Sequence, residues 1–178
     1  MQRITRNIGL ALVAGSALIV ATNGLAQSTQ KKEPAAARYY PFVGAWQGQG
    51  EFTEPGQAPV KLTLSLSCRK VSAGWAVACD MFARSNTMVI AESDLFGVDP
   101  LTGRGHWYAI TNQGETHDHL VEWDNAQTMK ARYAWTEDGR RMQESVEFSF
   151  KGTNALTFRS VVSADGKPVA QFSGSLKH

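Results

Sequence analysis

Two histidines on one expected strand are the residues of this chain best placed to do chemistry. His117 and His119 lie two positions apart, and side chains two apart on a β-strand point to the same face. Two imidazoles on one face can begin a zinc or copper site, which a neighbouring strand completes with a third ligand. They can equally serve as hydrogen-bond partners in a polar interior layer. The pair therefore predicts a polar site on the strand face that turns inward.

Short turns predict which residues lie opposite the histidines. The segments at 100–103, 113–114, 125–127 and 138–139 have turn chemistry and predict successive antiparallel hairpins, in which opposed residues share a face. Chaining these registers predicts one inward row across five strands: Leu95, Tyr108, His119, Tyr133 and Glu144. One adjacent layer holds Ile110, His117, Trp135 and Met142, and the other holds His106, Val121, Ala131 and Val146, while Trp107 is expected to face outward. A slip of one residue at any loop would exchange the two faces.

Three uses of this row remain open. A hydrogen-bonded layer would satisfy His119, Tyr133 and Glu144 within the interior. A ligand pocket would take its polar groups and its rim from seven residues: His119, Tyr133, Glu144, Tyr108, His117, Trp135 and His106. Its apolar wall would come from Leu64, Phe148 and Phe158, with Trp135. The third use is an enzyme or metal-binding protein that employs the inward cluster of His117, His119 and Glu144.

The sequence assigns neither metal ligands nor catalytic residues. Tyr108 and Tyr133 are expected to flank His119 and leave little room for a third metal ligand. Strand spacing places Glu144 and His119 near 10 Å apart, too far for direct proton transfer. The chain contains no GxSxG segment for a serine nucleophile. The sequence therefore favours ligand binding without a cofactor.

The elements that must position these residues are strands. From Phe42 onward the sequence alternates polar and apolar residues between closely spaced turns, which predicts an all-β chain. The expected strands are 43–53, 60–70, 75–83, 87–97, 104–112, 116–124, 128–136, 142–151, 154–163 and 168–176. Because no long crossover interrupts them, an antiparallel up-and-down β-barrel of about ten strands is favoured over a sandwich.

Cys68 and Cys79 are the only cysteines. If Ala73 and Gly74 form the tip of a hairpin, the two cysteines lie opposite each other and face inward. A disulfide between them suits an oxidising compartment. The cysteines therefore predict an interior cross-link and not a redox centre.

The N-terminal residues predict export. Arg3 and Arg6 precede an apolar run over residues 8–21, and small residues precede position 27, as in a secretory signal peptide covering 1–26. Residues 27–38 are expected to be a flexible tether, and 39–178 a single domain. Without the signal peptide, the basic and acidic side chains are equal in number. This neutrality argues against nucleic-acid partners, and the apolar run is too short to span a membrane.

A family resemblance rests on two stretches. The segment GAWQGQG, with Gly44, Trp46, Gly48 and Gly50, resembles the opening of calycin-type barrels such as lipocalins and nitrobindin-like proteins. With the Asp99-Pro100-x-Thr102-Gly103 hairpin and the run GETHDH at 114–119, the chain resembles a group of secreted bacterial domains of unknown function. The resemblance implies that the glycines bend the first strand and that Trp46 plugs one end.

Nitrobindin-like barrels hold haem through a histidine in the last strand. The corresponding stretch here has no histidine before the terminal His178, so we expect no haem. The sequence as a whole predicts a periplasmic or secreted lipocalin-like barrel that binds a small apolar or amphipathic molecule. We expect no membrane insertion after signal cleavage, and the oligomeric state stays open.

Overall fold

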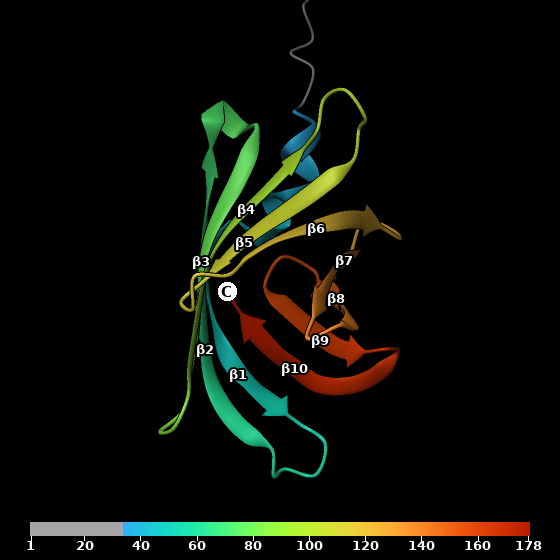
Figure 1. Cartoon of the computed structure of the whole chain (residues 1–178). Coiled ribbons are helices and arrows are strands. Elements are labelled where there is room, and N and C mark those ends of the chain that lie inside the picture. The colour runs from blue at the N-terminus through green and yellow to red at the C-terminus, as the bar shows by residue number, and fades with distance from the viewer. Residues whose placement is uncertain (1–33) are drawn as a thin grey trace, which may run out of the picture. The chain divides into compact units, whose positions relative to one another are not determined.

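The described residues, 34–178, form a closed antiparallel β-barrel in the computed structural model (Figure 1). Its strands are β1 (Gly44–Thr53), β2 (Val60–Val71), β3 (Ala76–Arg84), β4 (Val89–Val98), β5 (Gly105–Thr111), β6 (Thr116–Trp123), β7 (Thr128–Glu137), β8 (Arg140–Lys151), β9 (Ala155–Ala164) and β10 (Lys167–Lys177). Each strand pairs with the next, and β1 pairs with β10 to close the barrel. The predicted fold class is therefore confirmed, strand by strand.

Two 3-10 turns accompany the strands: η1 (Ala35–Phe42) at the start of the domain and η2 (Ser72–Gly74) between β2 and β3. The first packs against β3 and β4 and closes one end of the barrel (Figure 1). Ala36, Tyr39 and Phe42 are buried, so residues 35–38 differ from the flexible tether expected there. The predicted signal peptide lies outside the described residues. No helix among residues 34–178 is long and apolar enough to cross a membrane.

The closed end is sealed by aromatic side chains. The Phe42 ring stacks on Phe96, with centroids 4.9 Å apart, and meets Phe150 edge-on. Trp46 is 1% exposed, and its indole Nε1 donates a 2.7 Å hydrogen bond to the carbonyl oxygen of Phe42. The plug that the resemblance implied for Trp46 is therefore present, and η1 completes it.

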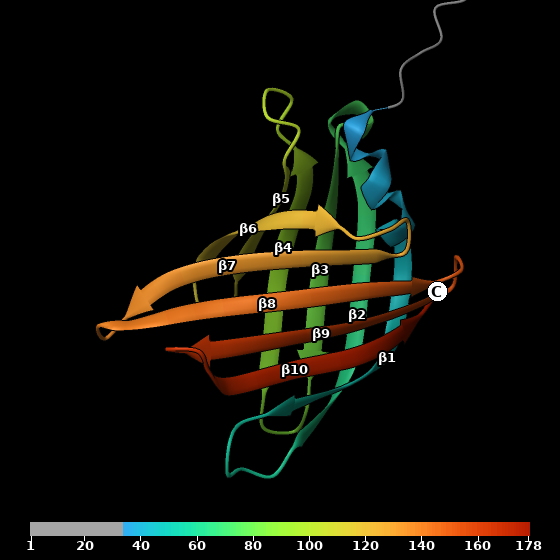
Figure 2. The same ribbon diagram turned by 90° about the vertical axis from the view of Figure 1, so that its right-hand side faces the viewer.

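Glycine at position 48 allows β1 to approach β10 closely. Gly48 is paired with Leu176, and a Cβ atom at residue 48 would lie 1.8 Å from the carbonyl oxygen of Ser175. In the view of Figure 2, β2–β5 run behind β7–β10 and cross them. The two halves thus close around one lumen.

The interior of β2 and β3 is as predicted. Leu62, Leu64, Leu66 and Cys68 are buried in alternation along β2. Cys68 pairs with Cys79 in the register and forms a disulfide with it. Both cysteines are buried, so the cross-link lies inside the barrel.

The predicted faces of β4 and β5 are wrong. Leu95 does pair with Tyr108, but both side chains face outward and are 43% and 44% exposed, and Ile110 is 54% exposed. Trp107, expected outside, is buried and pairs with His119. The physical reason is that the outer face of these strands is itself apolar, so apolarity does not distinguish the two faces.

Candidate functional site

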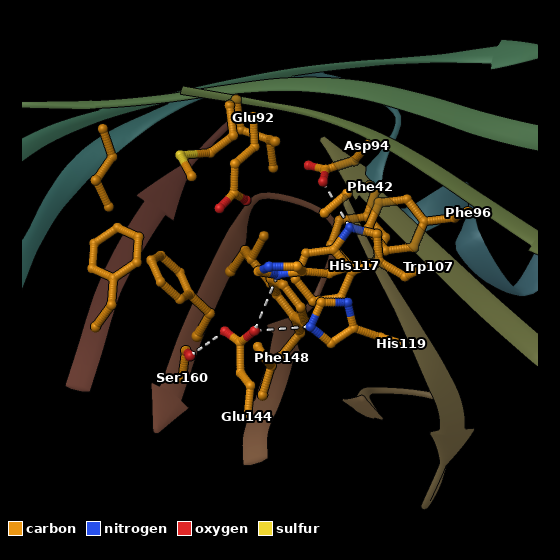
Figure 3. Close-up of a pocket in the computed structure, with 18 of the residues that line it drawn as sticks. Phe42, Glu92, Asp94, Phe96, Trp107, His117, His119, Glu144, Phe148 and Ser160 are labelled. Carbon is orange, nitrogen blue, oxygen red and sulfur yellow. Dashed lines mark hydrogen bonds and ion pairs between the residues drawn. The ribbon is translucent and has the colours of Figure 1, made fainter. Parts of the chain in front are cut away.

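A cavity of about 80 Å³ lies in the lumen (Figure 3). Most of its wall is apolar: Phe42, Leu64, Leu66, Met81, Phe96, Trp107, Ala109, Val146, Phe148, Leu156, Phe158, Phe172 and Leu176. Its polar lining consists of Glu92, Asp94, His117, His119, Glu144 and Ser160. On this measure one water occupies roughly 10–15 Å³. The cavity therefore has room for several waters or for a small part of a ligand.

A second cavity continues the first toward the end of the barrel opposite η1. Its volume is about 280 Å³, and its lining includes Phe52, Val89, Glu115, Trp135 and Gln171. Five residues line both cavities: Glu92, His117, Glu144, Ser160 and Phe172. We call this outer cavity the vestibule. The shared polar residues lie where the vestibule meets the inner cavity.

Glu144 on β8 is the centre of the polar cluster. His119 Nε2 donates a 3.0 Å hydrogen bond to Glu144 Oε2, and Ser160 Oγ donates one of 2.6 Å to Oε1 (Figure 3). Burial alone would raise the pKa of the Glu144 carboxyl. The hydrogen bond and charge of His119, with the hydrogen bond from Ser160, outweigh it and hold that pKa below its ordinary value.

The short distance between His119 and Glu144 corrects the predicted separation of about 10 Å. The strand spacing on which that prediction rested concerns backbones. Inside a closed barrel, side chains converge toward the axis, and the long Glu144 side chain reaches past Tyr133 on β7. The tyrosine ring stacks instead on His117 and Trp135, at centroid distances of 4.7 and 5.2 Å.

Stacking also fixes the two imidazoles. The His119 ring lies against Trp107 at 4.2 Å, with an interplanar angle of 16°. His117 Nδ1 is 3.9 Å from Glu144 Oε2, and His117 Nε2 is 3.8 Å from Glu115 Oε2. Both imidazoles therefore point a nitrogen at the same carboxylate.

Two further carboxyls, which are not among the predicted site residues, lie in the lumen. Asp94 accepts a 2.7 Å hydrogen bond from Trp107 Nε1, and burial raises its pKa to about 7 against the opposing effects of Trp107 and His119. Burial, with the nearby charges of Asp94 and Glu144, raises the pKa of Glu92 to about 8. Since Cys79 pairs with Asp94, extending the register from the inward cysteine across the β3–β4 hairpin would have found both.

The remaining predicted site residues divide between the two faces. Tyr133 and Trp135 lie on the inner face, with Trp135 in the vestibule. The inward positions predicted for Tyr108 and His106 are wrong. His106 is paired on the outer face with Asp118, at 2.9 Å from Nδ1 to Oδ1, and stacks on Tyr108. Because the inner face of β5 is the opposite of the predicted one, Tyr108 and His106 lie outside the lumen and Trp107 lies inside it.

His178, the only histidine after β9, does not line the lumen cavity. Its ring meets Trp46 edge-on, with centroids 4.8 Å apart, and Nε2 lies 3.4 Å from the carbonyl oxygen of Val43. The terminal imidazole thus packs against the closed end of the barrel.

No family model matches the chain, and no curated protein matches it significantly. Solved structures match its fold. Rv2717c from M. tuberculosis has a TM-score of 0.62 at 14% identity, over 82% of this chain and 97% of that one. The S-type phycobiliprotein lyase CPES from Guillardia theta has a TM-score of 0.52 at 12% identity, over 78% and 88% of the two chains.

A protein of unknown function from the DUF3598 family of Nostoc punctiforme has a TM-score of 0.53 at 10% identity. The match covers 78% of this chain and 48% of that one, about half of its length. At such identities the likeness concerns the fold alone. With the closed strand order, it shows that the chain has a calycin-like barrel.

Proposed function

We propose that this protein is a periplasmic or secreted carrier that binds a small amphipathic molecule in its lumen and performs no chemistry on it. One observation carries the proposal: an apolar inner cavity and an open vestibule meet at the polar cluster of Glu144, His117 and Ser160. Pockets with apolar walls and a few convergent polar groups are typical of small-molecule sites. The vestibule would admit the ligand, and the cluster would hold its polar end.

The charges of the residues that line the two cavities restrict the chemistry of the ligand's polar end. The two cavities are lined by the carboxyls of Glu92, Asp94, Glu115 and Glu144, and no lysine or arginine is among their described lining residues. A ligand carboxylate would meet the charge of Glu144, with which the His119 imidazole already pairs. A hydroxyl or amine can donate a hydrogen bond to Glu144. The ligand is therefore an alcohol or amine, or a molecule carrying such a group.

The proposed compartment rests on the disulfide and on the N-terminal segment. A buried Cys68–Cys79 bond is compatible with an extracellular or periplasmic location. The fold comparison is consistent with ligand binding, since a phycobiliprotein lyase shares this barrel. We propose, from the GxWxGxG opening, that the chain belongs with the secreted bacterial domains that it resembles.

Calorimetric titration with 1-octanol tests the proposal. Ala109 lines the inner cavity, and Ala134 is exposed on the outer face of the same barrel. We expect one octanol per wild-type barrel, affinity weakened at least about 10-fold in Ala109→Phe, and unchanged affinity in Ala134→Phe. The added phenyl ring would occupy space that the alkyl chain needs.

A second variant guards against misfolding of Ala109→Phe. Phe172→Trp enlarges a half-buried side chain that lines both cavities, and it is expected to weaken octanol binding while the circular dichroism spectrum stays that of the wild type. Octanol affinity unchanged in both folded lumen variants would refute lumenal binding.

A further inference from the structure

We propose that His117, His119 and Glu144 form a binding site for a divalent transition metal of the zinc class. The site does not depend on the proposed lumenal ligand, because its three ligand atoms come from the protein. They are one ring nitrogen from each histidine and one carboxylate oxygen of Glu144, and all three lie within 4.8 Å of one another. Two imidazoles and one carboxylate are a donor set that zinc uses with a fourth position left open.

The distances suit a metal ion after small movements. Bonds of about 2.0–2.1 Å in tetrahedral geometry place ligand atoms about 3.3 Å apart. Glu144 Oε2 lies 3.0 Å from His119 Nε2 and 3.9 Å from His117 Nδ1. The His119 side chain is only 1% exposed, whereas His117 is 20% exposed at the vestibule. A modest rotation of the more exposed His117 side chain would therefore complete the site.

The residues around the three ligands orient them, as hydrogen-bonding neighbours do in known metal sites. Ser160 donates to Glu144 Oε1 and leaves Oε2 free to face the imidazoles (Figure 3). Glu115 lies 3.8 Å from the other nitrogen of His117, close to the position of a carboxylate that orients a metal-bound histidine. Trp107 and Tyr133 stack on the rings of His119 and His117. Each ligand thus has a partner that limits its orientation.

The charge of the lumen favours a cation at this point. Glu92 and Asp94 line the same cavity as Glu144, and the two histidines are the only basic side chains among the described lining residues of both cavities. A divalent ion would be balanced by the Glu144 carboxylate, and it would favour the ionised forms of Glu92 and Asp94, whose pKa values burial raises. Its open coordination position would face the cavity, where water or the polar end of a bound molecule could complete the shell.

The unpartnered Nδ1 of His119 limits the affinity expected for a metal bound at Nε2. Nδ1 of this buried ring has no hydrogen-bond partner among the described residues, and Nε2 shares its proton with Glu144. A metal ion would replace that proton between Nε2 and Oε2, and the ring proton would then sit on Nδ1 without an acceptor. Missing outer partners weaken metal binding about 10–100-fold, so we expect the affinity to fall short of that of a fully supported zinc site.

Titration of metal-free protein with Zn²⁺ tests the site, in a chain purified without a histidine tag. We expect calorimetry to show one Zn²⁺ per barrel, with affinity reduced at least about 10-fold in Glu144→Gln and in His119→Ala. Glu144→Gln keeps the size of the side chain and can still accept hydrogen bonds. Co²⁺ in place of Zn²⁺ should give the intense visible absorption of a four-coordinate site, and this absorption should be lost in Glu144→Gln.

The outer pair of His106 and Asp118 provides the matched control. It also joins an imidazole to a carboxylate, at 2.9 Å, but it lies on the outer face and outside the three-residue cluster. His106→Ala is expected to bind Zn²⁺ as the wild type does. Absence of a one-to-one Zn²⁺ isotherm in the wild type, unchanged affinity in folded Glu144→Gln, or loss of binding in His106→Ala would each overturn the proposal.

Discussion

Glu144 illustrates why the site depends on one carboxylate. Its two oxygens have separate partners, with Ser160 on Oε1 and His119 on Oε2. This division leaves one edge of the carboxylate facing the two imidazoles and the mouth of the cavity. A hydrogen-bond donor or a metal ion that enters the lumen therefore meets an acceptor whose orientation is already set, which lowers the entropic cost of binding.

Glu92 makes the stability of the barrel depend on pH. Its pKa rises from 4.5 to about 8 on folding, mainly through burial. Between these values the unfolded chain releases the proton that the folded chain retains, so the free energy of unfolding falls as pH rises. We expect Glu92→Gln to flatten this fall, measured as melting temperature from pH 4.5 to 8.5 in the presence of EDTA. An identical pH profile in the variant and the wild type would contradict the assigned pKa.

At the scale of the elements, glycines in two different strands have different surroundings. Gly48 faces the backbone of β10, whereas Gly97 on β4 has open space where a Cβ would lie. Both glycines are in strands, so a substitution by alanine has opposite consequences at the two positions.

We expect Gly48→Ala to destabilise the barrel by about 2–3 kcal/mol, because the new methyl group would collide with the carbonyl of Ser175. Gly97→Ala should change stability by less than about 1 kcal/mol, and in the stabilising direction, since alanine is favoured over glycine within strands. Urea unfolding of both variants measures the difference. Equal stabilities would show that β1 and β10 do not approach as closely as described.

The hairpin of β2 and β3 is cross-linked near η2. The disulfide closes a loop of 11 residues, for which loop-closure entropy predicts about 3 kcal/mol of stabilisation. We expect the double variant Cys68→Ala with Cys79→Ala to lose about this amount in the free energy of urea unfolding. A loss well below 1 kcal/mol would mean that the cross-link adds little to a barrel already closed by β1 and β10.

The positions of the strands were easier to predict from the sequence than the side of each strand that faces the lumen. Alternation and turn residues were sufficient for all the strands, because both signals are local. The inward positions of β6–β8 and of the cysteines followed from hairpin register. The faces of β4 and β5 did not follow, because Leu95, Tyr108 and Ile110 form an apolar outer surface. A predicted register one residue off at the Gln113-Gly114 turn also made these outward residues match the inward residues of β6. The contact between His119 and Glu144 depends on side chains meeting across the lumen, which no local pattern encodes.

For the whole molecule, we predict selectivity among ligands of equal length. The lumen presents carboxyls, and no lysine or arginine is among its described lining residues. Metal-free protein at pH 8 should therefore bind 1-octanol and octylamine at least about 10-fold more tightly than octanoate. Competition calorimetry in EDTA measures this order. Preference for octanoate in metal-free protein would show that the charges of the lumen do not select the polar end.

Loading with Zn²⁺ should change that order. An open coordination position beside Glu144 would accept a carboxylate oxygen, so octanoate is expected to gain affinity in zinc-loaded protein and to gain none in Glu144→Gln. The same calorimetric series, repeated with one equivalent of Zn²⁺, measures the gain. Equal octanoate affinity with and without the metal would mean that no open position faces the cavity.

A crystal structure of the metal-free barrel with saturating 1-octanol tests lumenal binding most directly. We predict that the alkyl chain lies in the lumen against Phe148 and Phe158, with its hydroxyl within hydrogen-bonding distance of Glu144 or His117. Octanol bound only on the outer apolar surface around Leu95 and Tyr108, with the lumen holding water alone, would contradict it.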